Sequence, residues 1–421
     1  MSTQKELASA ATPRCRHCAA ELRLVAADLG ATPISNAFLT AGQIDKAEPF
    51  YPLRTYVCQV CRLVQLQDFF VSSDLFHEDY TYFSSYSPAW LAHAERYAAD
   101  MTRRWGLGAD SKVVEVASND GYLLQYFVQQ HIPVLGVEPS KSVADVAVAE
   151  RNVPTVVSFF GRETAETLRQ EGHAADLMAA NNVLAHVPDI NDFVAGFKTL
   201  LKPQGVVTFE FPHLLNLIRL TQFDTIYHEH FSYLSLLAVE RILAGAGLRA
   251  FDVEKLPTHG GSLRLYVCHE EADHTQTDNI LRIRAEEDDA GLGEDAVYLA
   301  FEERVREVKR ALLELLIGLK RDGKVIVGYG APAKGNTLLN YCGIGADMLD
   351  YTVDRSPHKQ GRFLPGTRLP VHDPSMIDET RPDYVLILPW NLEEEIRSDL
   401  QRIRSWGGRF ILPIPTPGIV D

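Results

Sequence analysis

The sequence predicts an α/β protein with two separate strand–helix units and a small cysteine-rich segment before them. Apolar, strand-like segments alternate with helical segments over 112–211, and the same alternation starts again at 324. Such alternation favours parallel sheets that are covered by helices on both faces. The cysteine-rich segment is recognised by four cysteines in two close pairs. We therefore expect three domains, at 1–75, 76–285 and 286–421.

The four cysteines form two pairs, Cys15 with Cys18 and Cys58 with Cys61, and each pair has the spacing Cys-x-x-Cys. A two-residue turn lets both thiolates of a pair reach one metal ion, and tetrahedral thiolate sites hold zinc. A disulfide or redox pair is the weaker interpretation, because the chain has only six cysteines and begins with polar residues rather than a secretory signal. Four thiolates leave no open position on the metal, so we predict a structural zinc ion in the N-terminal domain.

Composition excludes several classes of function. With 46% hydrophobic and 23% charged residues the chain is typical of a globular protein. No segment approaches the about 20 apolar residues of a membrane span, so we expect a cytoplasmic protein without membrane contact. The net charge of −15 disfavours binding to nucleic-acid phosphates, and with it a regulatory role for the zinc segment. We expect a monomer.

The order of elements in the central unit predicts its topology. A helix is expected at 90–105, and the segments that follow it are a strand at 112–116, a helix from 122, a strand at 134–137, a helix at 142–151, a strand at 176–180, a helix from 192 and a strand at 205–211. This order predicts a parallel, doubly wound, Rossmann-like sheet. Ligands bind such sheets at the carboxyl ends of the strands.

Polar residues follow three of these strands, where a cofactor would bind. The loop after the first strand has a single glycine, Gly121, and departs from the dinucleotide pattern GxGxxG at Ala117 and Asn119. That departure favours adenosylmethionine, which has no phosphate, although a purely structural turn is the alternative. Glu138 ends the next strand, where such folds bind ribose hydroxyls. The predicted cofactor-binding residues are Glu115, Ala117, Ser118, Asn119, Gly121, Tyr122, Glu138, Pro139, Asn181 and Asn182.

Four titratable residues stand in consecutive positions at Tyr227, His228, Glu229 and His230. The spacing differs from HExxH, so a metalloprotease helix is not indicated. In an extended segment His228 and His230 would lie on one side and the other two residues on the opposite side, which would provide a general base. A polar cluster before a helix at 236–246 is the structural alternative. His186, which follows the strand at 176–180, is a second candidate at the same edge of the sheet.

The C-terminal unit has its own glycine-rich turn. A long charged helix is expected at 294–321, followed by a strand, the turn from Gly328 to Gly330 and a helix start with Lys334 and Asn336. Further strands are expected at 349–353, with Asp354 at its end, and at 384–388. Backbone donors and a cation at a helix start suit a diphosphate. The residues alone leave NAD and a nucleotide sugar equally open as the ligand.

Taken together, these motifs resemble the nucleotide-sugar C-methyltransferases. The resemblance is closest to the dTDP-3-amino-2,3,6-trideoxy-4-keto-hexose 3-C-methyltransferases of the tetronitrose and kijanose type. The segments that carry it run in order along nearly the whole chain: both cysteine pairs, the segment with Tyr80 and Tyr82, and the segments 115–124, 181–188, 227–233, 258–264 and 328–337.

The resemblance implies a zinc-binding N-terminal domain, a central class I methyltransferase sheet and a C-terminal Rossmann-like domain that holds the nucleotide. It implies methylation at C3 of a dTDP-4-keto-deoxyaminosugar through an enolate, in the biosynthesis of antibiotic deoxysugars. We expect His230 to be the base, with Glu229 and Tyr227 positioning it or the substrate, and the C4 oxygen to be bound by Tyr80, Tyr82 or His186. The implied substrate-binding residues are Gly328, Gly330, Lys334, Asn336, Asp354, His259 and Arg264.

Two other functions remain open from the sequence. An NAD-dependent nucleotide-sugar oxidoreductase would use the turn at Gly328 and Gly330 together with Asp354. Methylation at C5, or at a nitrogen or oxygen of the sugar, would use the same cofactor on another atom. Transfer to nitrogen or oxygen needs no enolate, and it would leave the cluster at 227–230 without a catalytic role.

Overall fold

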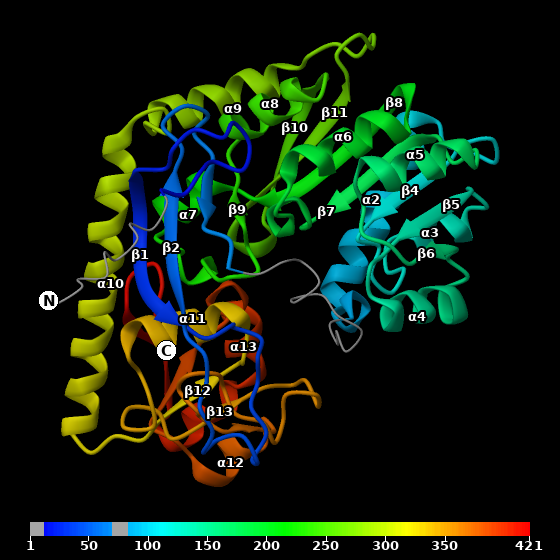
Figure 1. Ribbon diagram of the computed structural model, residues 1–421. Helices are drawn as coiled ribbons and strands as arrows, with labels where there is room; N and C mark the ends of the chain where they lie inside the picture. The colour runs from blue at the N-terminus through cyan, green and yellow to red at the C-terminus, as the bar shows by residue number, and fades with distance from the viewer. Residues whose placement is uncertain (1–11, 70–82) are drawn as a thin grey trace, which may run out of the picture.

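The computed structural model describes residues 12–69 and 83–421, and it contains an N-terminal, a central and a C-terminal sheet (Figure 1). The predicted α/β class with a second Rossmann-like unit is confirmed. Within the described residues, the helices are too short or too polar to cross a membrane. The cytoplasmic location, the monomeric state and the domain boundaries at 75/76 and 285/286 stay predictions.

The central sheet has seven strands in the order β10-β11-β8-β7-β4-β5-β6. Their bounds are β4 (Val113–Val116), β5 (Val134–Val137), β6 (Thr155–Val156), β7 (Ala175–Asn181), β8 (Leu201–Pro212), β10 (Leu248–Leu256) and β11 (Ser262–His269). The strands within 112–211 pair in parallel, as predicted, and two further strands add an antiparallel edge, because β11 runs antiparallel to both β8 and β10. The reason is the short connection from β10 to β11, the 3-10 turn η4 (Thr258–Gly260): a hairpin joins only antiparallel strands.

Helices cover both faces of this sheet. One face buries apolar side chains of α2 (Pro88–Trp105), α3 (Leu124–Gln129) and α4 (Lys141–Arg151). The other face packs against α5 (Arg162–Gln170), α6 (Ile190–Leu200), α8 (Leu236–Gly245) and α9 (Asp278–Asp289). Local sequence sets the helix ends: the Ser87 hydroxyl accepts the N–H of Trp90 at the start of α2, and Gly106, with φ 61°, ends that helix. The predicted positions of α2, α4 and α8 agree within two residues.

The C-terminal sheet has the order β14-β13-β12-β15-β16-β17, and its strands are parallel except for β17. Its strands are β12 (Ile326–Tyr329), β13 (Thr352–Val353), β14 (Val371–His372), β15 (Tyr384–Ile387), β16 (Arg409–Leu412) and β17 (Gly418–Val420). The helices of this unit are α11 (Ala333–Cys342), α12 (Met376–Thr380) and α13 (Glu393–Asp399). The carboxyl end of β12 carries the glycine-rich turn, as predicted.

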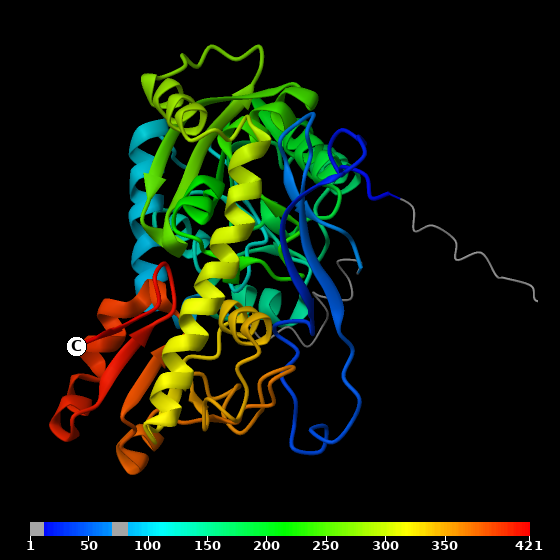
Figure 2. The same cartoon turned by 90° about the vertical axis from the view of Figure 1, so that its left-hand side faces the viewer.

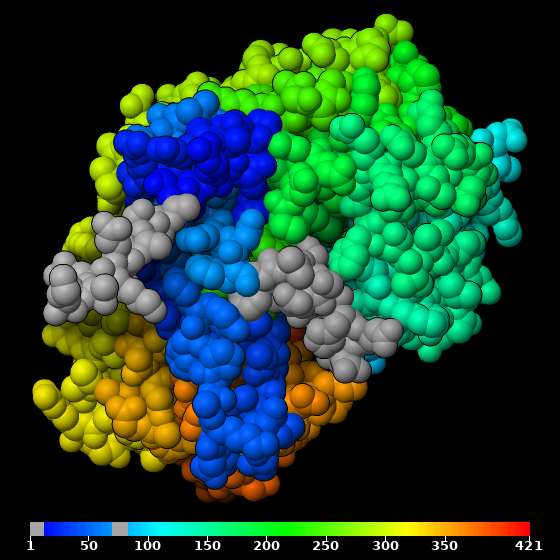
Figure 3. Space-filling view, viewed as in Figure 1, coloured from blue at the N-terminus to red at the C-terminus, as the bar shows by residue number. Residues whose placement is uncertain are grey.

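The N-terminal sheet joins the other two units. It consists of β1 (Leu24–Thr32), β2 (Tyr51–Val57), β3 (Val64–Leu66) and β9 (Ser232–Tyr233), the last of which belongs to the central part of the chain. The long helix α10 (Asp295–Arg321) packs along β1 and leads from the central to the C-terminal unit (Figures 1 and 2). In the space-filling view the blue N-terminal part lies against both the green and the orange parts (Figure 3).

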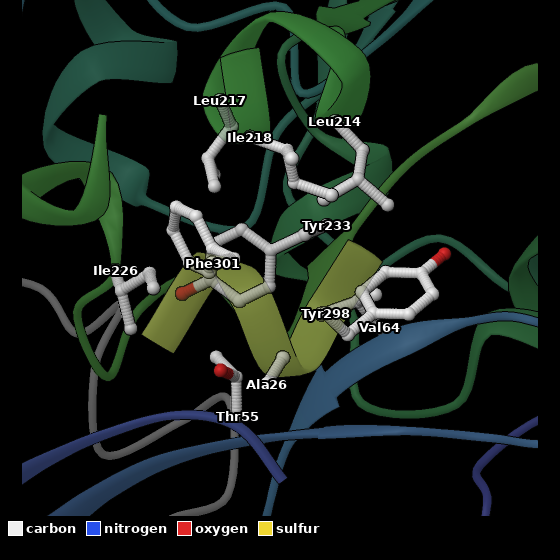
Figure 4. Close-up of a pocket in the computed structure, with 10 residues that line it drawn as sticks. All are labelled: Ala26, Thr55, Val64, Leu214, Leu217, Ile218, Ile226, Tyr233, Tyr298 and Phe301. Atoms are coloured by element: carbon white, nitrogen blue, oxygen red, sulfur yellow. The ribbon is translucent and has the colours of Figure 1, made fainter. Parts of the chain in front are cut away.

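A small internal cavity marks the place where these parts meet (Figure 4). Its lining comes from β1, β2, β3, β9, α7 (Leu214–Arg219) and α10, and is mainly apolar. Its polar groups are largely used elsewhere: the Thr55 hydroxyl donates to the carbonyl oxygen of Ala27 over 3.3 Å, and the Tyr298 hydroxyl donates to that of Leu292 over 2.8 Å. We therefore interpret the cavity as a packing gap between units.

The two cysteine pairs form turns of the same geometry. The N–H of Ala19 donates to the carbonyl oxygen of Cys15 over 2.9 Å, and the N–H of Arg62 donates to that of Cys58 over 2.8 Å. Ala19 and Arg62 both adopt positive φ, 60° and 62°. The turns bring four Sγ atoms within 4.8 Å of one another, those of Cys15, Cys18, Cys58 and Cys61. Four thiolates at this spacing fit a tetrahedral zinc ion.

Zinc should therefore be a permanent part of the fold. We expect elemental analysis to find one zinc ion per chain, and Cys58→Ser to lower both zinc content and melting temperature, because a ligand is lost. Cys268→Ser is the matched control, since Cys268 is buried in the central sheet away from the cluster and its loss should leave zinc content unchanged. A metal-free wild-type protein with an unchanged melting temperature would contradict this assignment.

Candidate active site

The loop after β4 is tied to the acidic residue at the end of β5. The N–H of Asn119 donates to Glu138 Oε2 over 3.0 Å, and the N–H of Ser140 donates to Glu138 Oε1 over 2.9 Å. Ala117 and Asn119 both adopt positive φ, 57° and 48°. Pro139 lies between Glu138 and Ser140 in the chain. These contacts bring the predicted cofactor-binding residues of two strands together at the carboxyl edge.

Gly121 is required for a reason that the sequence did not suggest. It has φ 77°, and an added Cβ would lie 3.1 Å from Val153 Cγ2 and 3.2 Å from Ala147 Cβ. The missing side chain thus allows the loop to pack against α4 and the connection that precedes β6, and the left-handed backbone excludes most other residues. Ser118 also faces inward, with its hydroxyl where a Cβ on Gly136 would lie.

Glu115, in β4 just before the cofactor loop, is a buried acid. Burial, reinforced by the charges of Asp120 and Glu138, holds the pKa of Glu115 well above its usual range. Asn181 donates to the Tyr122 hydroxyl over 3.4 Å, and its own amide oxygen is buried without a partner among the described residues. A carboxyl and an amide oxygen placed in this way suit a cationic, polar ligand, and adenosylmethionine carries an ammonium and a sulfonium group.

The segment at 227–230 forms a turn, so the expectation of an extended segment is wrong. The N–H of His230 donates to the carbonyl oxygen of Tyr227 over 2.9 Å, which folds the two residues onto each other. The Tyr227 hydroxyl lies 2.7 Å from His230 Nε2. His228 points elsewhere, since its Nε2 donates to the carbonyl oxygen of Pro52 over 3.2 Å. The turn therefore pairs Tyr227 with His230 and separates the two histidines.

Hydrogen bonds define the proton positions on His186 and His230. His230 Nδ1 lies 3.0 Å from the carbonyl oxygen of Thr225, and His186 Nδ1 lies 2.7 Å from that of Glu229. A carbonyl only accepts, so both Nδ1 atoms carry the proton and both Nε2 atoms carry a lone pair. Burial lowers the pKa of His186 to about 4 and holds the pKa of His230 well below its usual range. Their ring centroids are 4.6 Å apart, and both rings are neutral near pH 7.

The N-terminal unit contributes one residue to this cluster that sequence reasoning missed. Asn36 Nδ2 donates to Glu229 Oε1 over 3.0 Å. Burial raises the pKa of Glu229, and its Oε2 is buried without a partner among the described residues. Asn36 lies in an irregular segment far from the motif in sequence, so no pattern marks it. Tyr80 and Tyr82 lie outside the described residues.

A second set of polar side chains, which includes His259 and Arg264, lies near Asn182 and α2. His259 accepts a hydrogen bond from Asn182 over 3.3 Å, and its ring lies 5.5 Å from that of Trp90. Arg264, predicted to bind substrate, is buried and donates to Glu210 over 2.9 Å, and Glu210 also lies 3.0 Å from His93 Nε2. Sequence reasoning missed His93 and Glu210. Trp90 and His93 stand three residues apart on one face of α2, a spacing that could have revealed His93.

Lys334 of the C-terminal unit lies near Asp224 of the central unit, close enough for their charges to interact. Lys334 lies over the Trp390 ring, 4.4 Å from its centroid, and contacts Asn391. The Trp390 indole donates to Asp224 Oδ2 over 2.7 Å. Burial lowers the pKa of Lys334 to about 8 and raises the pKa of Asp224 to about 6, while the opposite charge of each partly offsets the shift of the other. An anionic ligand would stabilise the charged form of Lys334.

The other predicted substrate residues of this unit shape the turn itself. A Cβ on Gly330 would lie 2.6 Å from Pro389 Cδ, and one on Gly328 would lie 2.7 Å from Thr352 Oγ1. Asp354 accepts the N–H of Ala331 over 2.7 Å. Asn336 is buried and donates to the carbonyl oxygen of Ser35 over 2.7 Å, so its amide nitrogen contacts the N-terminal unit.

Loss of Gly121 should weaken cofactor binding through loop geometry. In Gly121→Ala the new Cβ must displace Val153 or Ala147, so we expect a lower melting temperature and at least tenfold weaker binding of adenosylhomocysteine in a calorimetric titration. Gly172→Ala is the control: Gly172 has φ 88° but nothing within 4 Å of its Cβ position. That variant should lose stability only. Equal affinities in both variants would place the cofactor elsewhere.

Comparison with known proteins finds three family models along the chain. Family models described as a zinc binding domain, a methyltransferase domain and a C-methyltransferase C-terminal domain match residues 15–76, 90–253 and 257–415. The C-methyltransferase NovU of Streptomyces niveus is 35% identical over 407 residues, 97% of this chain and 96% of that protein. An ubiquinone biosynthesis O-methyltransferase of Bartonella tribocorum is 28% identical over 96 residues, 23% of this chain and 39% of that protein.

Among solved structures, a SAM-dependent methyltransferase of Anabaena variabilis is 16% identical, with a TM-score of 0.36 over 43% of this chain and 86% of that one.

The predicted cofactors, adenosylmethionine and structural zinc, are confirmed by the methyltransferase and zinc binding family models and by the four-cysteine cluster. Because NovU matches the chain nearly from end to end, the protein belongs to the C-methyltransferases.

Proposed function

We propose that this C-methyltransferase methylates C3 of a dTDP-linked 4-keto-deoxyaminosugar in antibiotic biosynthesis, and that His230 provides the base. The observation that carries the proposal is the cluster of Tyr227, His230 and His186, which combines two neutral imidazoles with a phenol at the ligand-binding edge. Such a group suits the removal of a proton from carbon. The resemblance to nucleotide-sugar C-methyltransferases supports the choice of substrate.

Carbon methylation needs a carbanion equivalent. A C–H bond beside a ketone becomes acidic when a base removes the proton and a hydrogen-bond donor stabilises the enolate oxygen. Adenosylmethionine supplies an electrophilic methyl group for that carbon. A neutral histidine can accept the proton directly, because it need not first lose one of its own. Methyl transfer to nitrogen or oxygen would need no enolate, and it would leave this cluster without a role.

The hydrogen bond between Tyr227 and His230 suggests how the proton reaches the base. The lone pair of His230 Nε2 accepts from the Tyr227 hydroxyl. The substrate proton can reach Nε2 after the phenol turns aside, or the phenol can pass its own proton to Nε2 and take the substrate proton. His186 Nε2 and the protonated form of Glu229 are further groups that could contact the sugar near C4.

We further propose that the C-terminal unit binds the nucleotide. Lys334 lies beside Trp390, and Asp354 holds the turn that precedes α11. An aromatic ring offers a surface on which a base can stack, and a lysine suits a diphosphate. Gly328 and Gly330 leave no space for side chains, which keeps the backbone of the turn close to its neighbours.

Replacing His230 should separate binding from chemistry. We expect His230→Asn to bind adenosylhomocysteine and dTDP normally and to lower kcat by about 10²–10⁴-fold, the usual contribution of a general base. His228→Asn is the control within the same motif, since that side chain points to Pro52, and its kcat should change far less. If the phenol relays the proton, kcat of Tyr227→Phe should fall as far as that of His230→Asn. If the phenol only turns aside, kcat of Tyr227→Phe should resemble that of the His228→Asn control. Near-normal turnover by His230→Asn would exclude His230 as the base.

A further inference from the structure

Arg16, which lies between the zinc ligands Cys15 and Cys18, contacts the segments that carry the active-site histidines. Its side chain is only 5% exposed. One guanidinium nitrogen, Nη1, donates to the carbonyl oxygen of Pro188 over 2.9 Å. The other, Nη2, donates to the carbonyl oxygen of Leu66 and to Asp68 Oδ1, both over 2.8 Å. One side chain thus connects three separate parts of the chain.

Arg16 contacts a residue close in sequence to each of the two histidines, Pro188 near His186 and Phe231 near His230. Pro188 follows His186 by two positions. The N–H of Leu66 donates to the carbonyl oxygen of Phe231, the residue after His230, over 3.0 Å. The guanidinium carbon also lies 5.3 Å from the centroid of the Phe231 ring. Arg16 therefore contacts both segments whose imidazole rings lie 4.6 Å apart.

The same turn is joined to the metal ligands and to the helix after His186. The N–H of Arg16 donates to Gln65 Oε1 over 2.8 Å, and Gln65 Nε2 donates to Cys15 Sγ over 3.2 Å. His17 Nδ1 donates to Asn191 Oδ1 over 2.8 Å, and Asn191 Nδ2 donates to the carbonyl oxygen of His17 over 2.9 Å. The zinc turn is thereby connected to the first turn of α6 by two hydrogen bonds.

Burial of the Arg16 charge is energetically unfavourable, which argues against a role in packing alone. Among the described residues its one ionic partner is Asp68, whose side chain is 51% exposed, and the Nε of Arg16 is buried there without a partner. Burying a charge with incomplete pairing destabilises a protein, and an apolar side chain would be cheaper for packing alone. The planar fork of arginine, however, can donate in several fixed directions at once, which a lysine cannot do.

We propose that Arg16 is a positioning residue, which transmits the shape of the zinc turn to the segments carrying His186 and His230 and sets the spacing of the two rings. The zinc-binding unit then contributes to catalysis through this side chain without contacting the substrate. The inference rests on the proposed function only for its kinetic readout, because the spacing of the histidines can be measured without substrate.

Three variants test this role. Arg16→Ala removes all the guanidinium contacts, Arg16→Lys keeps the charge without the fork, and Arg23→Ala removes a side chain that is 74% exposed and pairs with Glu21 in the same unit. We expect all three to retain one zinc ion and normal affinity for adenosylhomocysteine. In both Arg16 variants kcat should fall by about 10²-fold, the effect of an about 1 Å misplacement, with KM for the sugar nucleotide nearly unchanged. Arg23→Ala should resemble the wild type.

Histidine NMR gives the readout that a purely structural role would not move. In the wild type His186 should titrate near pH 4, because it is buried. In the zinc-loaded Arg16 variants the signals of His186 and His230 should shift and titrate closer to the ordinary value of about 6.5, since looser segments admit water. Unchanged signals with wild-type kcat would overturn the proposal, as would loss of zinc or unfolding in both variants. Shifted signals together with a fully active His230→Asn would retain the positioning role and reject the proposed base.

Discussion

The pairing of β3 with β9 is the interaction on which the arrangement of the active site depends. Val64 pairs with Tyr233 and Gln65 with Ser232, so a strand that starts three residues after Cys61 runs beside the strand that follows His230. The apolar core of the central unit extends across this junction and includes three of the zinc-binding cysteines. The N-terminal unit is therefore packed against the candidate active site, and the zinc cluster lies beside the strand that pairs with the segment after the turn at 227–230.

Burial gives the site its chemical character. Glu229 is buried, His186 and His230 are half-buried, and burial shifts each group toward its neutral form. Neutral imidazoles can accept protons, and a neutral carboxyl can donate a hydrogen bond. Because the same burial makes unpaired polar groups costly, each ring is fixed by a backbone carbonyl, at Glu229 for His186 and at Thr225 for His230. The fold thus defines which nitrogen of each ring carries the proton and which carries the lone pair.

Sequence patterns predicted the parts of this protein that depend on local order. The strand at 134–137 and the helices near 142–151 and 294–321 follow from hydrophobic periodicity, and the cysteine spacing predicted the metal cluster. Contacts between distant segments were not predictable in this way. Asn36 and Arg16 reach the catalytic segments only because β1 and β3 fold back on the central unit. The turn at 227–230 was also missed, because a tyrosine and a histidine three residues apart fit an extended segment equally well.

The central claim is that methyl transfer follows ionisation of the C3–H bond of the sugar. A dTDP-4-keto-deoxyaminosugar labelled with deuterium at C3 tests it most directly, with product and solvent examined by mass spectrometry and NMR. The account predicts that the methylated product carries no deuterium at C3 and that the label appears in water. A methylated product that retains the C3 deuterium would contradict it, because the methyl group would then have been transferred to another atom without formation of the C3 enolate.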